Sequence, residues 1–193
     1  MSENELIIKA SKGNVQAFET IIKKYERLIY SICYRMFRNK EDTLDICQEV
    51  YIKIYKNLEK VIGHGNFKNW VCTVTTNTCI DELRKRKDLL SLDAPIKHND
   101  ENLQRDIVDK DFTPEEFIIE KEKKEILEVA ISKLSPDFKS IIILREIENY
   151  NYDEIAEILN INVGTVKSRL SRGRKKLQEI YLKEKETDSE RRN

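Results

Sequence analysis

The scarcity of glycine and proline constrains this fold more than any other feature of the sequence. Five glycines and three prolines occur among the 193 residues, whereas average usage would give about 13 and 10. These two residue types most often interrupt helices and form turns, so their scarcity predicts long helices with short connections. Hydrophobic residues make up 39% of the chain, which is enough for modest cores between such helices. We therefore predict an all-α protein.

Three helices are predicted in the N-terminal half from apolar residues at helical spacing. The first begins at Val15, with Asn14 as its expected N-cap. The second covers Lys40–Leu58, and the third covers residues 67–87, after the loop VIGHGN. The apolar stripe of the second helix consists of Leu44, Cys47, Val50, Tyr51, Ile54 and Leu58. Together these helices predict a first domain over residues 1–90.

The helical periodicity stops between residues 91 and 113. This segment is polar, and its acidic residues outnumber its basic residues. Because long structureless loops are uncommon inside compact domains, we predict a flexible acidic linker here. It offsets part of the positive charge found elsewhere, so the formal net charge of zero reflects segregated charge. A second domain is predicted over residues 114–185, and residues 186–193 are expected to form a disordered tail.

The second domain is predicted to contain two short helices before a basic one. Ser135 followed by Pro136 is typical of a helix N-terminus. Asn151 and Glu154 have the spacing of a capping box and predict a short helix, YDEIAEIL, over residues 152–159. A tight turn follows, and a basic helix is then predicted over Val163–Leu177.

The basic helix has the composition of a helix that binds nucleic acid. It holds six basic residues and no acidic one, so it cannot form the i,i+4 ion pairs of a solvated surface helix. Its predicted core-facing residues are Val163, Val166, Leu170, Gly173 and Leu177, which would pack on Ile155, Ala156 and Leu159. The opposite face places small residues where bases would approach and long cations where phosphates would pass. Two short helices joined by a tight turn, the second one basic, predict a helix-turn-helix.

Several function classes find no support in the sequence. It contains no glycine-rich phosphate loop, nucleophile elbow or paired-histidine helix, so we predict neither an enzyme nor a cofactor. The cysteines at positions 33, 47, 72 and 79 lack zinc spacing, so we predict reduced thiols and no metal site. No apolar run reaches the roughly 20 residues of a membrane span, and no signal peptide is indicated. A cytoplasmic location is therefore expected.

The segment YDEIAEILNINVGTVKSRLSRGRKKL, Tyr152–Leu177, resembles the region 4.2 helix-turn-helix of extracytoplasmic-function (ECF) sigma factors. Response-regulator output domains also carry TVKS-type helices, so this segment alone does not separate the two classes. In the sigma family the element reads the minus-thirty-five duplex in the major groove. The resemblance implies this role for Lys167, Ser168, Arg169, Ser171, Arg172 and Lys175.

Three N-terminal segments resemble region 2 of the same family, in the expected order. GNVQAFETIIKKYERLIYSICYRMFRN resembles region 2.1, KEDTLDICQEVYIKIYKNL resembles region 2.2, and NFKNWVCTVTTNTCIDELRKRK resembles regions 2.3 and 2.4. With the C-terminal match, these resemblances cover nearly the whole chain. They imply an alternative sigma factor that directs core RNA polymerase to specific promoters.

The resemblance also implies partners and contact residues. The second helix would bind the β′ clamp helices of RNA polymerase through Asp45, Gln48 and Glu49, and region 4 would contact the β flap. Region 2 would capture the minus-ten element as it melts, with a base flipped from the non-template strand. The residues implied in that capture are Gly63, His64, Asn66, Asn77, Asp81, Arg84 and Lys85. An anti-sigma factor that covers the polymerase-binding faces is a further partner implied by the family.

The chain departs from the family pattern at several positions. Thr73, Thr76 and Thr78 stand where relatives often carry basic or small residues, which predicts weaker strand melting or a greater dependence on the minus-thirty-five contact. Gly173 replaces a common alanine, and a glycine inside a helix costs up to about 1 kcal/mol, so we expect a weak point there. Trp70 is a candidate for stacking on a base, but its place within V-C-x-V periodicity favours the core.

Two other classes of protein explain part of the sequence. A stand-alone repressor or activator would account for the basic helix. It would leave the Asp45 face and the glycine loop without a role, and neither a dimerisation surface nor a ligand pocket is indicated. An anti-sigma or adaptor protein that binds only polymerase would leave the basic helix unexplained.

Overall fold

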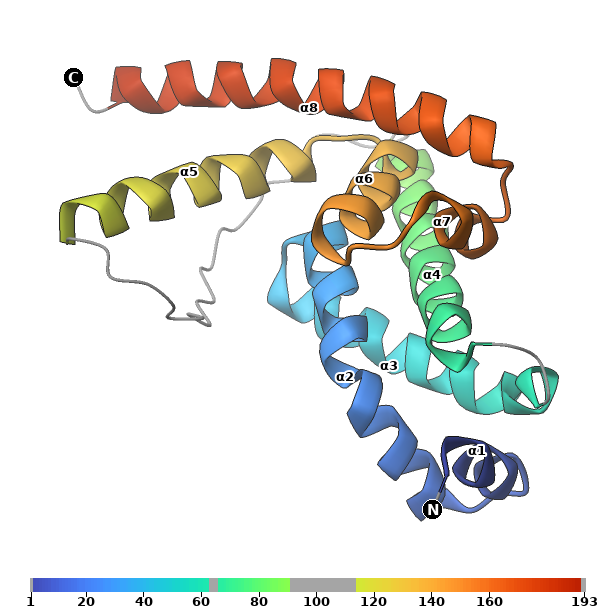
Figure 1. The fold of residues 1–193 in the computed structure, drawn as a ribbon. Coiled ribbons are helices and arrows are strands. Elements are labelled where there is room, and N and C mark those ends of the chain that lie inside the picture. The colour runs from blue at the N-terminus through green and yellow to red at the C-terminus, as the bar shows by residue number, and fades with distance from the viewer. Residues whose placement is uncertain (1, 63–65, 91–113, 192–193) are drawn as a thin grey trace.

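The structure is a computed structural model that describes residues 2–62, 66–90 and 114–191, and the regular structure of these residues is entirely helical. Gly63, His64 and the predicted linker lie outside the described residues. The N-terminal group consists of α1 (Glu3–Ser11), α2 (Val15–Phe37), α3 (Lys40–Asn57), the 3₁₀ helix η1 (Leu58–Val61) and α4 (Phe67–Leu90). The C-terminal group consists of α5 (Pro114–Ser132), α6 (Pro136–Ile142), the π-helix η2 (Ile143–Ile147), α7 (Tyr152–Leu159) and α8 (Val163–Arg191). Figure 1 shows both groups.

The predicted N-terminal helices are present, and one helix was missed. Asn14 caps α2 as expected, because its Oδ1 accepts a hydrogen bond from the Ala17 N–H at 2.9 Å. Helix α1 was not predicted, although Ser2 and Glu5 form a capping box at its start. Its residues Leu6, Ile7 and Ala10 are buried, and it packs against α2 and η1. The N-terminal domain is therefore larger than its three predicted helices.

The predicted helix-turn-helix is also present. Asn151 and Glu154 form the expected capping box at the start of α7, and Asn160 ends this helix in the left-handed conformation. The Asn162 Oδ1 then accepts a hydrogen bond from the Thr165 N–H at 2.7 Å, which satisfies a backbone donor in the first turn of α8. The core-facing residues of α8 were predicted correctly: Val166, Leu170 and Gly173 are buried, and Val163 and Leu177 are half-buried.

Helix α8 is longer than the sequence indicated. It was expected to be weak at Gly173 and to end near Leu177, with a disordered tail from residue 186. It instead runs without a break through Arg191. Gly173 is buried against Phe138 and Ile142 of α6, and the distal part of α8 packs on α5, where Glu184 pairs with Lys133 at 2.6 Å. Tertiary contacts therefore offset the weak intrinsic helix propensity.

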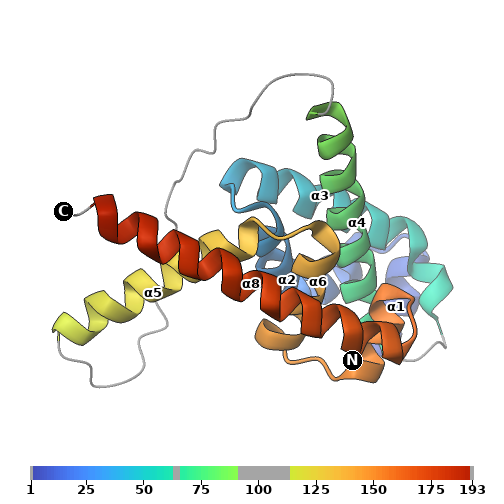
Figure 2. The ribbon, with the colours of Figure 1, turned by 90° about the horizontal axis from the view of Figure 1, so that it is seen from above.

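The two groups of helices contact each other directly. Helices α6 and α7 pack against α4, and α5 and α6 pack against α2, as the views in Figures 1 and 2 show. The buried hydrophobic residues form one cluster with members from both groups. None of the helices in the described part of the chain is long and apolar enough to cross a membrane. The domains predicted on either side of the linker thus share a core.

Candidate nucleic-acid and protein interfaces

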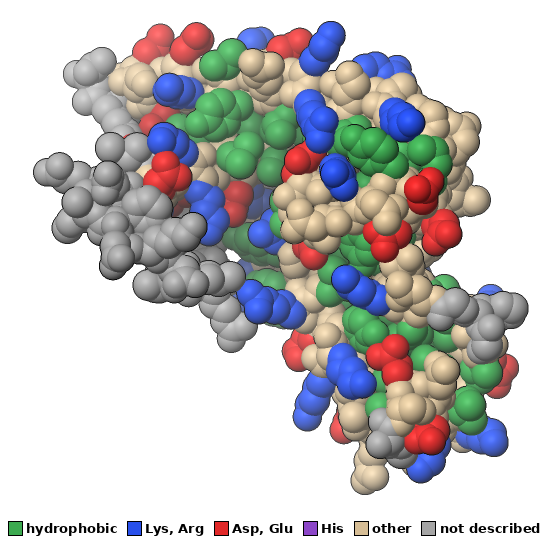
Figure 3. Space-filling model, viewed as in Figure 1, with side chains coloured by type: hydrophobic (Ala, Val, Ile, Leu, Met, Phe, Trp, Pro, Cys, Tyr) green, Lys and Arg blue, Asp and Glu red, His purple; other side chains and the backbone are tan. Residues whose placement is uncertain are grey.

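The outward face of α8 carries most of the residues predicted for duplex DNA. Lys167, Ser168, Ser171, Arg172 and Lys175 are all exposed. Figure 3 shows Lys and Arg side chains along this helix. The Arg172 guanidinium lies along the helix, donating from Nε to the Ser168 carbonyl oxygen at 3.3 Å and from one terminal nitrogen to Ser168 Oγ at 3.4 Å. Small hydroxyl side chains between long cations suit a helix that enters the major groove.

Other cations of α8 are paired with carboxylates. Arg174 donates to Glu146 of the π-helix η2 at 2.6 Å, which raises the pKa of this guanidinium further. Arg169, a residue predicted for the duplex, is only partly exposed and lies 3.9 Å from the Asp137 carboxylate. Within the described residues, Lys167, Arg172 and Lys175 form no ion pair. The cations of the basic helix thus divide into paired ones and ones that are available to phosphates.

The residues predicted for the minus-ten strand form one stripe on α4. Asn77, Asp81, Arg84 and Lys85 are exposed and follow helical spacing. Three of them also line an open cavity of about 250 Å³ between α3 and α4, whose other lining residues are Glu49, Lys53, Thr78 and Glu82. Of the loop residues predicted for the same strand, Asn66 is described, and it precedes α4. The Asn66 side chain accepts a hydrogen bond from the Lys68 N–H at 3.0 Å at the start of α4.

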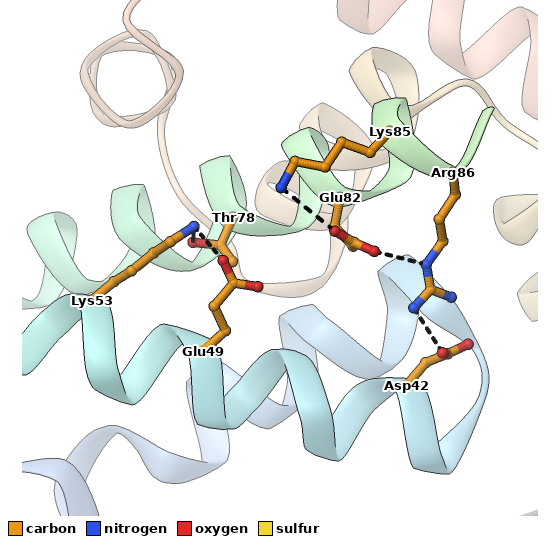
Figure 4. Close-up of polar contacts among 7 residues, drawn as sticks. All are labelled: Asp42, Glu49, Lys53, Thr78, Glu82, Lys85 and Arg86. Carbon is orange, nitrogen blue, oxygen red and sulfur yellow. Dashed lines mark hydrogen bonds and ion pairs between the residues drawn. The ribbon is translucent and has the colours of Figure 1, made fainter. Parts of the chain in front are cut away.

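The face of α3 that was predicted to bind polymerase is only partly as expected. Asp45 and Gln48 are exposed, but Glu49 turns toward α4 and pairs with Lys53 at 2.7 Å (Figure 4). Lys53 also donates to Thr78 Oγ1 at 3.3 Å. Placing Leu44 in the buried stripe was wrong, because 45% of Leu44 is exposed. Its spacing from Gln48 and Ile52 is i, i+4 and i+8, which places Leu44 with the exposed residues.

An exposed apolar pair accompanies the polar residues on α3. Leu44 and Ile52, the latter 53% exposed, flank Gln48 along one side of the helix. Single exposed apolar residues are ordinary, but two at helical spacing beside polar groups suit a protein–protein contact. Sequence reasoning missed both residues because it assigned function to charge and amide groups and reserved apolar residues for the core.

A second charged network connects α3 to α4. Arg86 donates to Asp42 of α3 at 2.8 Å and to Glu82 of α4 at 3.1 Å (Figure 4), and its guanidinium lies over the Phe37 ring. The hydrogen bond to Asp42 raises the pKa of Arg86. This arginine belongs to the basic run RKRK, but its geometry is that of a residue that holds helices together.

The threonines of α4 have a structural explanation. Thr76 and Thr78 are buried, and Thr78 donates to the Val74 carbonyl oxygen at 2.8 Å. A cation at either buried position would lose its hydration, which is costly. Thr73 is half-buried and donates to the Asn69 carbonyl oxygen at 2.9 Å. Trp70 is partly buried and packs on Phe67, in agreement with its predicted place at the core.

The four cysteines are buried free thiols, and they lie in the N-terminal group of helices. Burial raises the pKa of Cys72 to about 12. Cys79 and Cys33 approach each other, with their sulfur atoms 3.7 Å apart. Among the described residues, no group of His, Cys, Asp and Glu side chains is arranged to hold a metal ion.

Comparisons with known proteins match two separate parts of the chain to family models. Residues 21–88 match the family model of sigma-70 region 2, and residues 124–177 match that of sigma-70 region 4. The chain is 35% identical over 173 residues to the ECF RNA polymerase sigma factor SigW of Bacillus subtilis, covering 89% of this chain and 92% of that protein.

Solved structures show the same fold. The sigma factor RpoE of Bartonella quintana, in complex with the anti-sigma factor NepR, has a TM-score of 0.64 at 21% identity, covering 86% of this chain and 97% of that one. CnrH, in complex with the cytosolic domain of CnrY, has a TM-score of 0.62 at 17% identity, covering 92% and 96%. The arrangement is thus that of a two-region sigma factor. The chain belongs to the ECF RNA polymerase sigma factors, which direct transcription initiation.

Proposed function

We propose that this sigma factor divides its work among three surfaces. The exposed face of α8, with Lys167, Arg172 and Lys175, reads the minus-thirty-five duplex. The stripe of Asn77, Asp81, Arg84 and Lys85 on α4 captures the melted minus-ten strand, together with the predicted loop that contains Gly63 and His64. The face of α3 around Asp45 and Gln48 docks on the β′ clamp helices of core RNA polymerase, and region 4 contacts the β flap.

The observation that carries this proposal is that α8 exposes long cations that have no carboxylate partner among the described residues. Three long cations without ion pairs among the described residues alternate with Ser168 and Ser171 on one exposed face. Lysine and arginine side chains that contact phosphates release the counterions condensed on the DNA, which provides a large part of the affinity, while the small residues allow the helix to approach base edges. A helix that only faced solvent would instead be stabilised by pairing such cations with acidic residues at i,i+4.

The polymerase face is supported by its mixed character. Leu44 and Ile52 provide apolar area, and Asp45 and Gln48 provide polar contacts at the same surface. Protein–protein interfaces combine an apolar centre with polar residues at the rim. We extend the polymerase-binding set from Asp45, Gln48 and Glu49 to include Leu44 and Ile52, with Glu49 contributing mainly through its pair with Lys53.

The protein itself is proposed to catalyse nothing and to act in the cytoplasm, where promoter DNA and polymerase are found. Strand opening would be favoured by binding energy, since the few kcal/mol lost on flipping a base are offset by contacts with the extruded base and the backbone. RpoE, which shares this fold, has been solved with the anti-sigma factor NepR bound. We propose an anti-sigma factor as the negative regulator of this chain as well.

The test is run-off transcription with purified core RNA polymerase on genomic DNA fragments, with and without the protein. We expect discrete transcripts that require it. Asp45→Lys should reduce these transcripts and weaken polymerase binding by about tenfold, as expected when a charge is reversed inside an interface. The matched control is Glu59→Lys, the same charge reversal at an exposed residue of η1. Tight binding to duplex DNA without any polymerase-dependent transcript would instead identify a stand-alone regulator.

A further inference from the structure

The N-terminal turn of α6 is one of the places where region 4 docks on region 2. Lys139 is buried, and its ammonium group donates to the Met36 carbonyl oxygen, near the C-terminus of α2, at 3.0 Å. Nearby, Ser31 of α2 donates to Glu148 at 2.6 Å. Because a buried Lys side chain has little freedom to move, these contacts fix the position of the first turn of α6 relative to region 2.

Asp137, two residues before Lys139, faces both proposed DNA-binding surfaces at once. Its Oδ1 lies 3.0 Å from a terminal nitrogen of Arg84 on α4 and 3.9 Å from a terminal nitrogen of Arg169 on α8. Arg84 belongs to the stripe proposed for the minus-ten strand, and Arg169 to the helix proposed for the duplex. One carboxylate of region 4 therefore neutralises an arginine from each of the two DNA-binding surfaces.

A carboxylate and a phosphate oxygen satisfy a guanidinium in the same way, since both are anionic and both accept hydrogen bonds in the plane of the guanidinium group. While Arg84 and Arg169 are paired with Asp137, this carboxylate competes with a nucleic-acid phosphate for their guanidinium groups. The Arg84–Asp137 pair requires α6 and α4 to stay together, so it is made while the two regions are packed against each other, whereas Arg169 and Asp137 both belong to region 4.

We propose that Asp137 is an internal competitor of DNA phosphate at both DNA-binding surfaces, and that it competes for Arg84 while regions 2 and 4 are packed together. The inference rests on the proposed function, because it takes Arg84 and Arg169 as DNA contacts. Binding of polymerase or DNA that separates the regions removes Asp137 from Arg84 and makes this arginine available to the single strand.

The expected effect is graded, because the ion pairs are partly exposed. Side-chain exposure is 58% for Arg84, 32% for Arg169 and 44% for Asp137. Exposed pairs contribute little, so removal of the carboxylate should change DNA affinity by about two- to fivefold on each surface. Asp137 thus tunes binding and does not block it.

The test compares Asp137→Asn with Asp153→Asn in the full-length protein. The two residues are matched, because Asp137 is the second residue of α6 and Asp153 is the second residue of α7. Asp153 is exposed and forms no ion pair within the described residues. Binding is followed by fluorescence anisotropy with a labelled single strand and, separately, a labelled duplex, both of mixed sequence. Thermal unfolding of both variants checks that the fold is kept.

We expect Asp137→Asn to tighten binding to both probes by about two- to fivefold, and Asp153→Asn to change it by less than twofold. The gain for the single strand should disappear when Arg84→Ala is also present, and the gain for the duplex should disappear with Arg169→Ala. Equal affinities of the two Asn variants on either probe would overturn the proposal.

The arginine variants separate failure of this inference from failure of the proposed function. If Arg84→Ala weakens binding of the single strand and Arg169→Ala weakens binding of the duplex, the proposed DNA contacts hold. Equal DNA affinities of the Asp137→Asn and Asp153→Asn variants would then reject only the proposal that Asp137 competes with phosphate. If neither arginine variant weakens binding, the proposed DNA contacts of Arg84 and Arg169 are wrong, and the proposed role of Asp137, which depends on them, is rejected as well.

Discussion

The basic run of α4 and the basic face of α8 appear equivalent in the sequence but differ in the structure. On α4, Arg84, Lys85 and Arg86 all have carboxylate partners, and Arg86 has two. On α8, Lys167 and Lys175 have none among the described residues. The cations at 84–86 on α4 are therefore already paired with carboxylates, two of them across to neighbouring helices, whereas the same composition on α8 leaves charge unpaired and available for DNA.

The difference follows from what each helix packs against. Helix α4 lies between α3 and α6, both of which present acidic residues to it, Asp42 and Asp137. Helix α8 packs on α5, α6 and α7 and leaves its other side to solvent, so in the described part of the chain carboxylates from other elements pair with two of its basic-run cations, Arg169 and Arg174. Charge pairing thus depends on neighbours in space, which the composition of a single helix does not reveal.

The sharpest test of this comparison is charge reversal on the free face of α8. Arg172→Glu should weaken binding to duplex DNA by roughly tenfold or more, because it removes a cation and adds an anion against the phosphates. The matched control is Lys183→Glu, the same reversal at an exposed position further along α8. Anisotropy titrations at several salt concentrations measure both. Equal losses for the two variants would mean that the face around Arg172 has no special role.

Lys139 represents a third kind of cation, buried and without a carboxylate partner among the described residues. Burial lowers the pKa of Lys139 to about 8, so the folded state binds its proton less tightly than the unfolded chain does. The contribution of this residue to stability is therefore least favourable below pH 8 and increases as the pH rises toward its unfolded pKa, by at most about 1.4 kcal/mol per pH unit.

Lys139→Met should raise the free energy of unfolding at pH 7 by roughly 1–2 kcal/mol, because the lost desolvation penalty exceeds the lost hydrogen bond to Met36. The advantage of the variant over the wild type should shrink between pH 8 and pH 10, as the pKa of Lys139 is about 8. Urea denaturation at pH values from 7 to 10 measures the difference in free energy of unfolding between variant and wild type. The control is Lys124→Met, the same substitution at an exposed position. A variant less stable than the wild type at pH 7 would contradict the argument.

Arg86→Ala tests the structural role assigned to the basic run of α4. The free energy of unfolding should fall by about 1 kcal/mol, since the network is partly exposed and such pairs are individually weak. The control is Lys87→Ala, the neighbouring exposed cation, which should leave stability unchanged. Affinity for single-stranded DNA should change little in the Arg86 variant. A loss of affinity without a loss of stability would place Arg86 among the DNA contacts instead.

The fold could be predicted from the sequence where local signals are strong. The caps at Asn14, Asn151 and Glu154 and the apolar spacing of α2, α3, α7 and α8 placed those helices correctly. The contact between regions 2 and 4 could not be predicted, because residues far apart in the chain form it. The exposure of Leu44 was missed for a related reason, since hydropathy alone does not show which apolar residues a bundle leaves outside.

The candidate interfaces were predicted as sets of residues but not as pairs. Resemblance to the family indicated Arg84, Arg169 and Glu49, yet the carboxylate or ammonium partners of these residues come from contacts that the motifs do not record. The partners Asp137 and Lys53 determine whether each residue is free to bind a ligand. The π-helix at residues 143–147, which carries Glu146, had no sequence signal that we recognised.

A substitution at Gly173 adds a single methyl group and tests how α8 is stabilised. A Cβ at this position would lie 3.5 Å from Ile142 Cγ1 and Phe138 Cδ1, which is ordinary van der Waals contact. Gly173→Ala should therefore raise the free energy of unfolding by about 0.5–1 kcal/mol, through lower entropy of the unfolded chain and better helix propensity.

Gly164→Ala is the matched control in the same helix. There, the added Cβ would lie 3.3 Å from the Asn162 Oδ1 that caps the helix, so crowding at the cap should offset the gain in propensity. Urea denaturation compares the two variants. Equal gains would show that helix propensity alone governs α8. A loss at Gly173 would show that α6 and α8 pack too tightly for a methyl group, and that the chain needs glycine there for close approach.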